Sequence, residues 1–181
     1  MNIFLSSFQK DDIKQLPAFL DAVISDAFKQ DGIDDKEGEK EEIQKQFNRI
    51  KESVKTSGES TFFIVARNKD DNKIIGTIGY EEPNDLIKEN LNVNLANVPE
   101  ITSALVLPVY QGRRIGSLLF QEILKSLKQK NIHKFCLDGG YKKSQGFWTK
   151  KLGEPDVILK DHYGKGLPYM IWYRDINKIQ V

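Results

Sequence analysis

Residues 101–127 read ITSALVLPVYQGRRIGSLLFQEILKSL, and the fold can be worked out from them. The apolar run 101–107 predicts a central strand, which Pro108 closes. A helix is predicted next, because apolar residues recur at the four-residue spacing of one helix face, namely Ile115, Leu119, Ile123 and Leu127. We therefore expect a strand, a glycine-containing turn and a helix in direct succession.

The turn at 110–117 has features of an anion-binding site. Unpaired amides and the helix dipole favour a phosphate group at a helix start. Gly112 and Gly116 let the backbone approach a pyrophosphate, and Arg113 and Arg114 offer charge-assisted contacts. An ordinary strand-to-helix turn with exposed arginines explains the same residues, so both interpretations stay open.

Two other phosphate-binding loops are excluded by their spacing. A Walker loop needs glycine before its Lys-Ser pair, whereas Lys142 precedes Lys143-Ser144. The dinucleotide fingerprint needs glycines at its first, third and sixth positions, and Gly112 and Gly116 are four apart. No Gly-x-Ser-x-Gly elbow is present either, so kinase and hydrolase functions lack support.

The rest of the chain predicts alternating strands and helices. Residues 82–98 show no sustained periodicity, so we expect an irregular surface insertion that lines a binding cleft. The other expected elements are a strand at 3–8, helices over 13–28 and 43–54, a hairpin of 61–66 with 73–80, a strand at 135–137, a helix at 144–152, and strands at 157–159 and 169–173.

Composition limits the class of protein. With 181 residues we expect one domain, 1–181. Twenty-seven basic and 26 acidic residues give a net charge of +1, which provides no field for capturing nucleic acid or a membrane. The single cysteine, Cys136, and two histidines are too few for a disulfide or a Cys/His zinc site. Without a signal-like start or an apolar run of membrane-spanning length, a cytoplasmic location is expected.

The run Leu105-Val106-Leu107-Pro108-Val109-Tyr110-Gln111-Gly112-Arg113-Arg114-Ile115-Gly116-Ser117 resembles the acetyl-CoA signature of the GCN5-related N-acetyltransferase (GNAT) family. In that family a Gln/Arg-x-x-Gly-x-Gly/Ala turn follows a bulged strand. Its amides bind the coenzyme pyrophosphate, and the strand pairs with the pantetheine arm. The resemblance thus implies coenzyme contacts from Leu105, Val106, Leu107, Gln111, Gly112, Arg113, Arg114, Ile115, Gly116 and Ser117. Arg114 replaces the family's middle glycine, which is costly if that position needs a positive φ.

The resemblance extends in element order over nearly the whole chain. It implies an α/β acyl-CoA N-acyltransferase fold, with a mixed, mostly antiparallel central sheet flanked by helices. The segment 147–153 looks like the family's aromatic-rich helix ending in Leu-Gly, and Thr149 then falls where a tyrosine general acid is common. Threonine is too weak an acid for that role.

Glu100 is the candidate catalytic residue. It lies eleven positions before Gln111, where histone-type members of the family place the glutamate that deprotonates the amine. The alternative interpretation is a solvated carboxylate at the edge of a strand. Cys136 is interpreted as a small core residue rather than a nucleophile.

The expected activity is direct transfer of acetyl from the cosubstrate acetyl-CoA to a primary amine of a small molecule or peptide, in a ternary complex and without a metal. A homodimer is possible. The alternative is a catalytically inactive acyl-CoA-binding regulatory module, for which Thr149 is the strongest observation.

Overall fold

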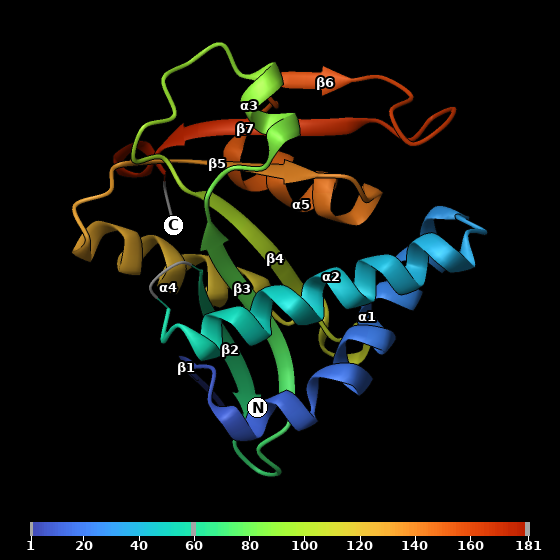
Figure 1. The fold of residues 1–181 in the computed structure, drawn as a ribbon, viewed down its shortest axis with the longest axis vertical. Coiled ribbons are helices and arrows are strands. Elements are labelled where there is room, and N and C mark those ends of the chain that lie inside the picture. The colour runs from blue at the N-terminus through green and yellow to red at the C-terminus, as the bar shows by residue number, and fades with distance from the viewer. Residues whose placement is uncertain (1, 59–60, 180–181) are drawn as a thin grey trace. The chain divides into compact units, whose positions relative to one another are not determined.

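The computed structural model describes residues 2–58 and 61–179 (Figure 1). Its strands hydrogen-bond in the order β1-β2-β3-β4-β5-β7-β6. The β4–β5 pair is parallel, and the other pairs of known register are antiparallel, which confirms the expected mixed, mostly antiparallel sheet. The strands are β1 (Ile3–Ser7), β2 (Phe62–Asn68), β3 (Ile74–Glu81), β4 (Glu100–Val106), β5 (Lys134–Gly139), β6 (Val157–Leu159) and β7 (Tyr169–Asp175).

The helices follow the expected order along the chain. They are α1 (Leu16–Asp31), α2 (Lys36–Lys55), α3 (Asp85–Asn90), α4 (Ile115–Gln129) and α5 (Lys142–Leu152), with short 3-10 segments η1 (Lys10–Lys14), η2 (Pro108–Tyr110) and η3 (Ile176–Lys178). Within the described residues, no helix is both long and apolar enough to cross a bilayer.

Close contacts divide the chain into two compact units. The first comprises Met1–Tyr80 and Ser103–Ile123, and the second comprises Glu81–Thr102 and Leu124–Val181. Strand β4 and helix α4 therefore contribute residues to both units. The single domain over 1–181 stays a prediction.

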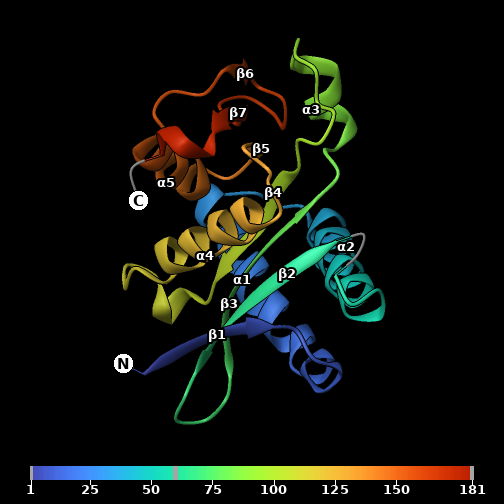
Figure 2. The same ribbon diagram turned by 90° about the vertical axis from the view of Figure 1, so that its left-hand side faces the viewer.

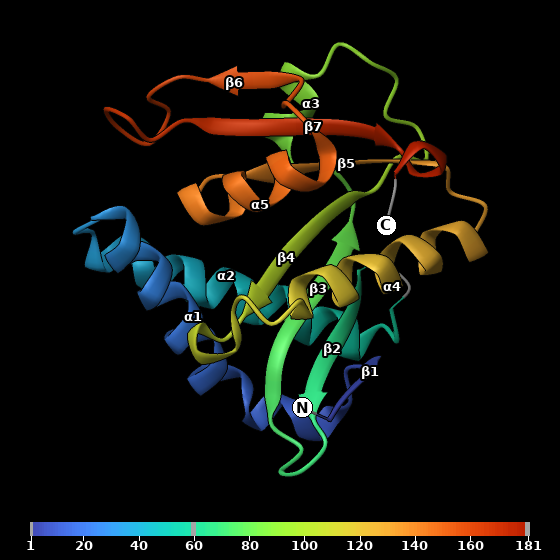
Figure 3. The same cartoon turned by 180° about the vertical axis from the view of Figure 1, so that it is seen from behind.

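In the first unit, helices cover both faces of the strands. Helices α1 and α2 lie on one face of β2 and β3, and the first part of α4 lies on the other (Figures 1 and 3). Helix α1 ends at Gly32, whose φ of 70° suits glycine. Helix α2 begins at Lys36, earlier than expected, because the Asp35 side chain accepts a hydrogen bond from the Gly38 N–H and caps it.

In the second unit, α3 and α5 lie on opposite faces of β5 and β7 (Figure 2). The expectation that 82–98 is irregular was therefore wrong in part, since α3 lies within it. Asn84 caps this helix by accepting a hydrogen bond from the Ile87 N–H (2.9 Å). The segment is anchored in an apolar cluster made of Ile87, Leu91, Val98, Cys136, Tyr169 and Ile171.

Candidate active site

Helix α4 follows β4 after the short segment η2 and the turn 111–114 (Figure 3). The first helical hydrogen bond joins the Leu118 N–H to the Arg114 carbonyl (3.0 Å). The N–H groups of 115–117 precede it, so no carbonyl of the helix can accept from them. With the positive end of the helix dipole, these donors form the arrangement that binds phosphate groups.

The turn before α4 holds two residues in the left-handed region. Gly112 has a φ of 72°, and Arg114 has a φ of 65°. The glycine that the family signature has at position 114 is thus explained by backbone geometry, and Arg114 adopts this conformation at a cost in strain. Both arginines are exposed, and the Arg113 guanidinium lies 5.5 Å from the centre of the Tyr110 ring.

The last residues of β4 differ in the direction of their backbone groups. Leu107 donates its N–H to the Ile75 carbonyl on β3 (3.0 Å). Because successive strand residues address alternate edges, Val106 turns its N–H and C=O away from β3. Gln111 reaches back on that edge and donates from Nε2 to the Val106 carbonyl (3.1 Å). Of Leu105, Val106 and Leu107, the three residues of the predicted site before the turn, Val106 is therefore best placed to offer its N–H to a ligand.

Gly76 on β3 allows this close arrangement. A Cβ at this position would lie 3.0 Å from the Leu105 carbonyl oxygen, 3.1 Å from Leu119 Cδ1 and 3.3 Å from Ile115 Cγ2. Such contacts are tighter than ordinary van der Waals contact, so a side chain here would push its neighbours apart, and the glycine lets β3 pack directly against the end of β4 and the start of α4.

Strand β4 also departs from an extended backbone at Ser103, where φ is 53°. The Ser103 carbonyl accepts a hydrogen bond from Thr77 Oγ1 (2.9 Å), and its hydroxyl contacts Gln46 of α2. This irregularity agrees with the bulged strand of the family signature. The sequence offered no local sign that Gln46 would stabilise it.

Glu100 lies at the start of β4, in the second unit. The residue is 1% exposed, so it is not the solvated strand-edge carboxylate of the alternative interpretation. Glu100 Oε2 accepts a hydrogen bond from the Asn84 N–H (2.7 Å). In parallel pairing, Glu100 lies opposite Cys136 of β5.

Sequence reasoning missed three polar residues, Asn84, Asp138 and Tyr169, which form a hydrogen-bonded network that reaches Glu100 through Asn84. Asn84 Nδ2 donates to Asp138 Oδ2 (2.8 Å), and the Tyr169 hydroxyl donates to the same oxygen. Burial, together with the Asp138 charge, raises the pKa of Tyr169. The raised pKa makes Tyr169 a weaker acid than an ordinary tyrosine, and its hydroxyl already donates to Asp138, so it does not replace the missing tyrosine general acid.

Thr149, at the position where the family often has a tyrosine general acid, and its neighbour Trp148 contribute to the structure of α5. The Thr149 carbonyl accepts the Gly153 N–H (2.9 Å) at the end of α5. Trp148 is 3% exposed, so its ring belongs to the core.

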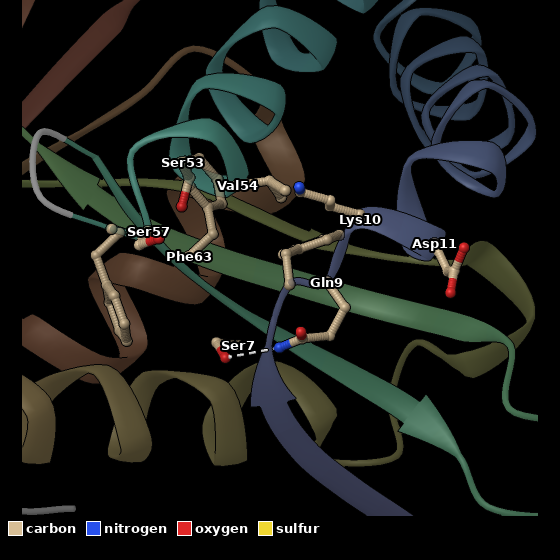
Figure 4. A pocket seen from close by; sticks show the side chains of 11 residues that line it. Ser7, Gln9, Lys10, Asp11, Ser53, Val54, Ser57 and Phe63 are labelled. Carbon is tan, nitrogen blue, oxygen red and sulfur yellow. Dashed lines mark hydrogen bonds between the residues drawn. The ribbon is translucent and has the colours of Figure 1, made fainter.

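A cavity of about 440 Å³ lies elsewhere in the first unit (Figure 4). Residues from the segment after β1, such as Gln9 and Lys10, and from the end of α2, such as Ser53 and Val54, line it. None of the residues of the predicted site lines this cavity.

Comparison with protein families supports the sequence resemblance. A family model described as the acetyltransferase (GNAT) family matches residues 21–153, which include the whole turn and Glu100. No curated protein sequence matches the chain significantly.

Solved structures share the fold at low identity. A PaiA N-acetyltransferase from Thermoplasma acidophilum, in complex with coenzyme A, has a TM-score of 0.69 and 20% identity over 97% of this chain and 99% of its own. A putative acetyltransferase of the GNAT family from Desulfovibrio desulfuricans has a TM-score of 0.69 and 14% identity over the same shares. A chimera of a Vibrio cholerae spermidine N-acetyltransferase has a TM-score of 0.64 and 12% identity, covering 98% of each chain.

Proposed function

The chain belongs to the acetyltransferase (GNAT) family, and we propose that it transfers acetyl from acetyl-CoA to a primary amine of a small molecule or a peptide. The observation that carries the proposal is the turn 111–117, which leads into α4. It contains two glycines and two exposed arginines, and the N–H groups of 115–117 have no carbonyl partner within the helix. Along the same strand that leads into this turn, the buried Glu100 supplies a carboxylate.

The coenzyme is proposed to bind through its pyrophosphate. The N–H groups of Ile115, Gly116 and Ser117 point out of the N-terminal end of α4, and Arg113 and Arg114 add positive charge beside them. The Val106 N–H is proposed to stabilise negative charge on the thioester oxygen as the carbonyl carbon becomes tetrahedral. No protein side chain needs to carry the acetyl group.

The proposed reaction is a direct attack. The amine nitrogen forms a bond to the thioester carbon, the carbon–sulfur bond breaks, and the coenzyme leaves as a thiolate. The ammonium group loses one proton to Glu100 before it attacks, and the nitrogen loses a second proton to solvent as it becomes an amide nitrogen. Because Thr149 is too weak an acid and Tyr169 already donates its proton to Asp138, the thiolate takes its proton from solvent.

The acceptor is proposed to arrive as a cation. Glu100 and Asp138 are linked through Asn84, and two carboxylates favour an ammonium group over a neutral or anionic acceptor. Of the similar structures, one is named for acetylation of spermidine, itself a polyamine. Polyamines, amino-sugar antibiotics, amino acids and lysine peptides are therefore the acceptors to test first.

The deciding experiment measures release of free coenzyme A with this panel of amines and the mass of each product. An acetylated amine, with a mass gain of one acetyl group, supports the proposal. Binding of acetyl-CoA without turnover on any amine favours the inactive acyl-CoA-binding module instead. Failure to bind acetyl-CoA contradicts both functions.

A further inference from the structure

Four of the hydrogen bonds of Asn84 link helix α3 to two acids and a tyrosine. Its Oδ1 accepts the Ile87 N–H and caps α3 (2.9 Å). Its backbone N–H donates to Glu100 Oε2 (2.7 Å), and its Nδ2 donates to Asp138 Oδ2 (2.8 Å) and lies 3.3 Å from the Tyr169 hydroxyl. One residue thus orients both carboxylates.

The two acids lie on the same face of the sheet. Glu100 is paired with Cys136, and Asp138 follows Cys136 by two residues, so its side chain points the same way. Both acids lie near the Cys136 thiol. Burial is the main cause of its raised pKa, and the charges of Glu100 and Asp138 raise it further. Asn84 approaches this face from the insertion between β3 and β4 and bonds to both acids.

Capping alone does not explain Asn84. A cap needs one side-chain acceptor, which serine or aspartate supplies as well as asparagine does. The Nδ2 donor serves Asp138 instead, and it holds the segment so that the Asn84 N–H reaches Glu100. An aspartate at this position would cap α3 but would face Asp138 with a like charge.

We propose that Asn84 is a positioning residue, which fixes the orientation of the Glu100 carboxylate by bonding to Asp138 through its side chain and to Glu100 through its backbone. Its effect on catalysis rests on the proposed function, in which Glu100 accepts the amine proton. Its effect on the geometry of the Glu100 carboxylate is independent of the proposed function.

The test reverses the polarity of the Asn84–Asp138 hydrogen bond. Asn84→Asp keeps the cap and removes the donor, and we expect kcat to fall at least about tenfold, with KM for acetyl-CoA unchanged. In the double variant Asn84→Asp with Asp138→Asn, the amide of position 138 donates to position 84, and kcat should return to within about threefold of native. Asn90→Asp places the same charge in the same helix without a bond to either acid, and should stay within about twofold of native.

A second readout needs no turnover. The carboxyl carbon resonance of Glu100, identified by its loss in Glu100→Gln, should move at pH 7 in Asn84→Asp and in Asn84→Ser, and should return in the double variant. If the native protein acetylates no amine, the proposed function fails, and this resonance alone decides the role of Asn84. An unmoved resonance in Asn84→Asp overturns the inference, and so does a double variant that stays as impaired as the single one.

Discussion

The Ser103 hydroxyl donates a hydrogen bond of 2.5 Å to Oε1 of Gln46. Ser103 is the residue of β4 with a φ of 53°, and Gln46 is a buried residue of α2 whose Nε2 donates to Glu42 (2.7 Å). Helix α2 is therefore bonded to the strand at the point where its backbone departs from the extended form. Removing one partner of a buried hydrogen bond costs more than the bond contributes, because the other partner is desolvated.

We expect Gln46→Met to lower the free energy of unfolding by about 1–3 kcal/mol, since methionine preserves the volume but neither donates to Glu42 nor accepts from Ser103 as an amide does. Urea unfolding measures this change. Gln44→Met, on the exposed side of the same helix, is the matched control. Equal losses in the two variants would show that the buried amide contributes nothing specific.

Arg114 has the wrong side chain for its backbone conformation. With a φ of 65°, it should be less stable than glycine, and Arg114→Gly should raise the free energy of unfolding by about 1 kcal/mol. The same change at Arg113, which is not among the positive-φ residues, should lower it by a similar amount because glycine adds flexibility to the unfolded chain. Thermal unfolding of the two variants compares them directly, and a stabilisation that is the same at both positions contradicts the strain argument.

The departure at Arg114 shows what the sequence could and could not predict. The mismatch with the family's glycine was visible, and so was the question of a positive φ, but only the backbone answers it. The strand–turn–helix unit was predictable because its apolar spacing is local. Helix α3 has only six residues, too few for a periodic pattern, although Pro83-Asn84-Asp85 carries a helix-start signal.

The polar surroundings of Glu100 were not predictable for a different reason. Asn84 and Asp138 are 54 positions apart, and Asn84 and Tyr169 are 85 apart. No spacing rule relates residues at such separations, because the pairing of β4, β5 and β7 brings them together. The sequence identified Glu100 through a family resemblance, and the partners that orient it follow from tertiary structure alone.

Gly116 lies in the first turn of α4, where the pyrophosphate is proposed to approach. Acetyl-CoA at 100 times its Kd should stabilise the native protein by about 2.7 kcal/mol and raise its Tm by several degrees. Gly116→Glu places bulk and negative charge at the phosphates and should abolish this shift. Gly146→Glu is the control, since a Cβ at this exposed position of α5 meets no atom within 4 Å. A folded Gly116→Glu protein with a native shift would locate the coenzyme elsewhere.

Cys136 makes stability depend on pH. Burial first, and then the charges of Glu100 and Asp138, raise the pKa of its thiol from 9.0 to about 12. Between these values the folded chain keeps a proton that the unfolded chain has released. The stabilisation that comes from this pKa difference is thus fully present below pH 9. As the pH rises toward 12 it is lost, and the free energy of unfolding falls by up to about 1.4 kcal/mol per pH unit.

We therefore expect the free energy of unfolding of the native protein, measured with urea, to fall relative to that of Cys136→Ala as the pH rises from 8 to 10.5. Comparing the two proteins removes the contribution of lysines and tyrosines, which titrate in the same range in both. Parallel curves over this range would mean that the thiol titrates alike in the folded and unfolded chains.

The last prediction concerns Glu100 itself. An amine with the pKa of lysine, about 10.4, is almost fully protonated at pH 7, so freeing its lone pair costs roughly 4–5 kcal/mol and a proton acceptor is needed. Glu100→Gln preserves the shape and can still accept the Asn84 N–H, but it cannot take the amine proton. Turnover near neutrality should fall about 100-fold or more, while the Kd for acetyl-CoA, measured by calorimetry, stays native because the coenzyme contacts are proposed at Val106 and the turn 111–117. Native turnover with a native pH profile would assign proton removal to another group or to water, and only the coenzyme half of the proposed site would stand.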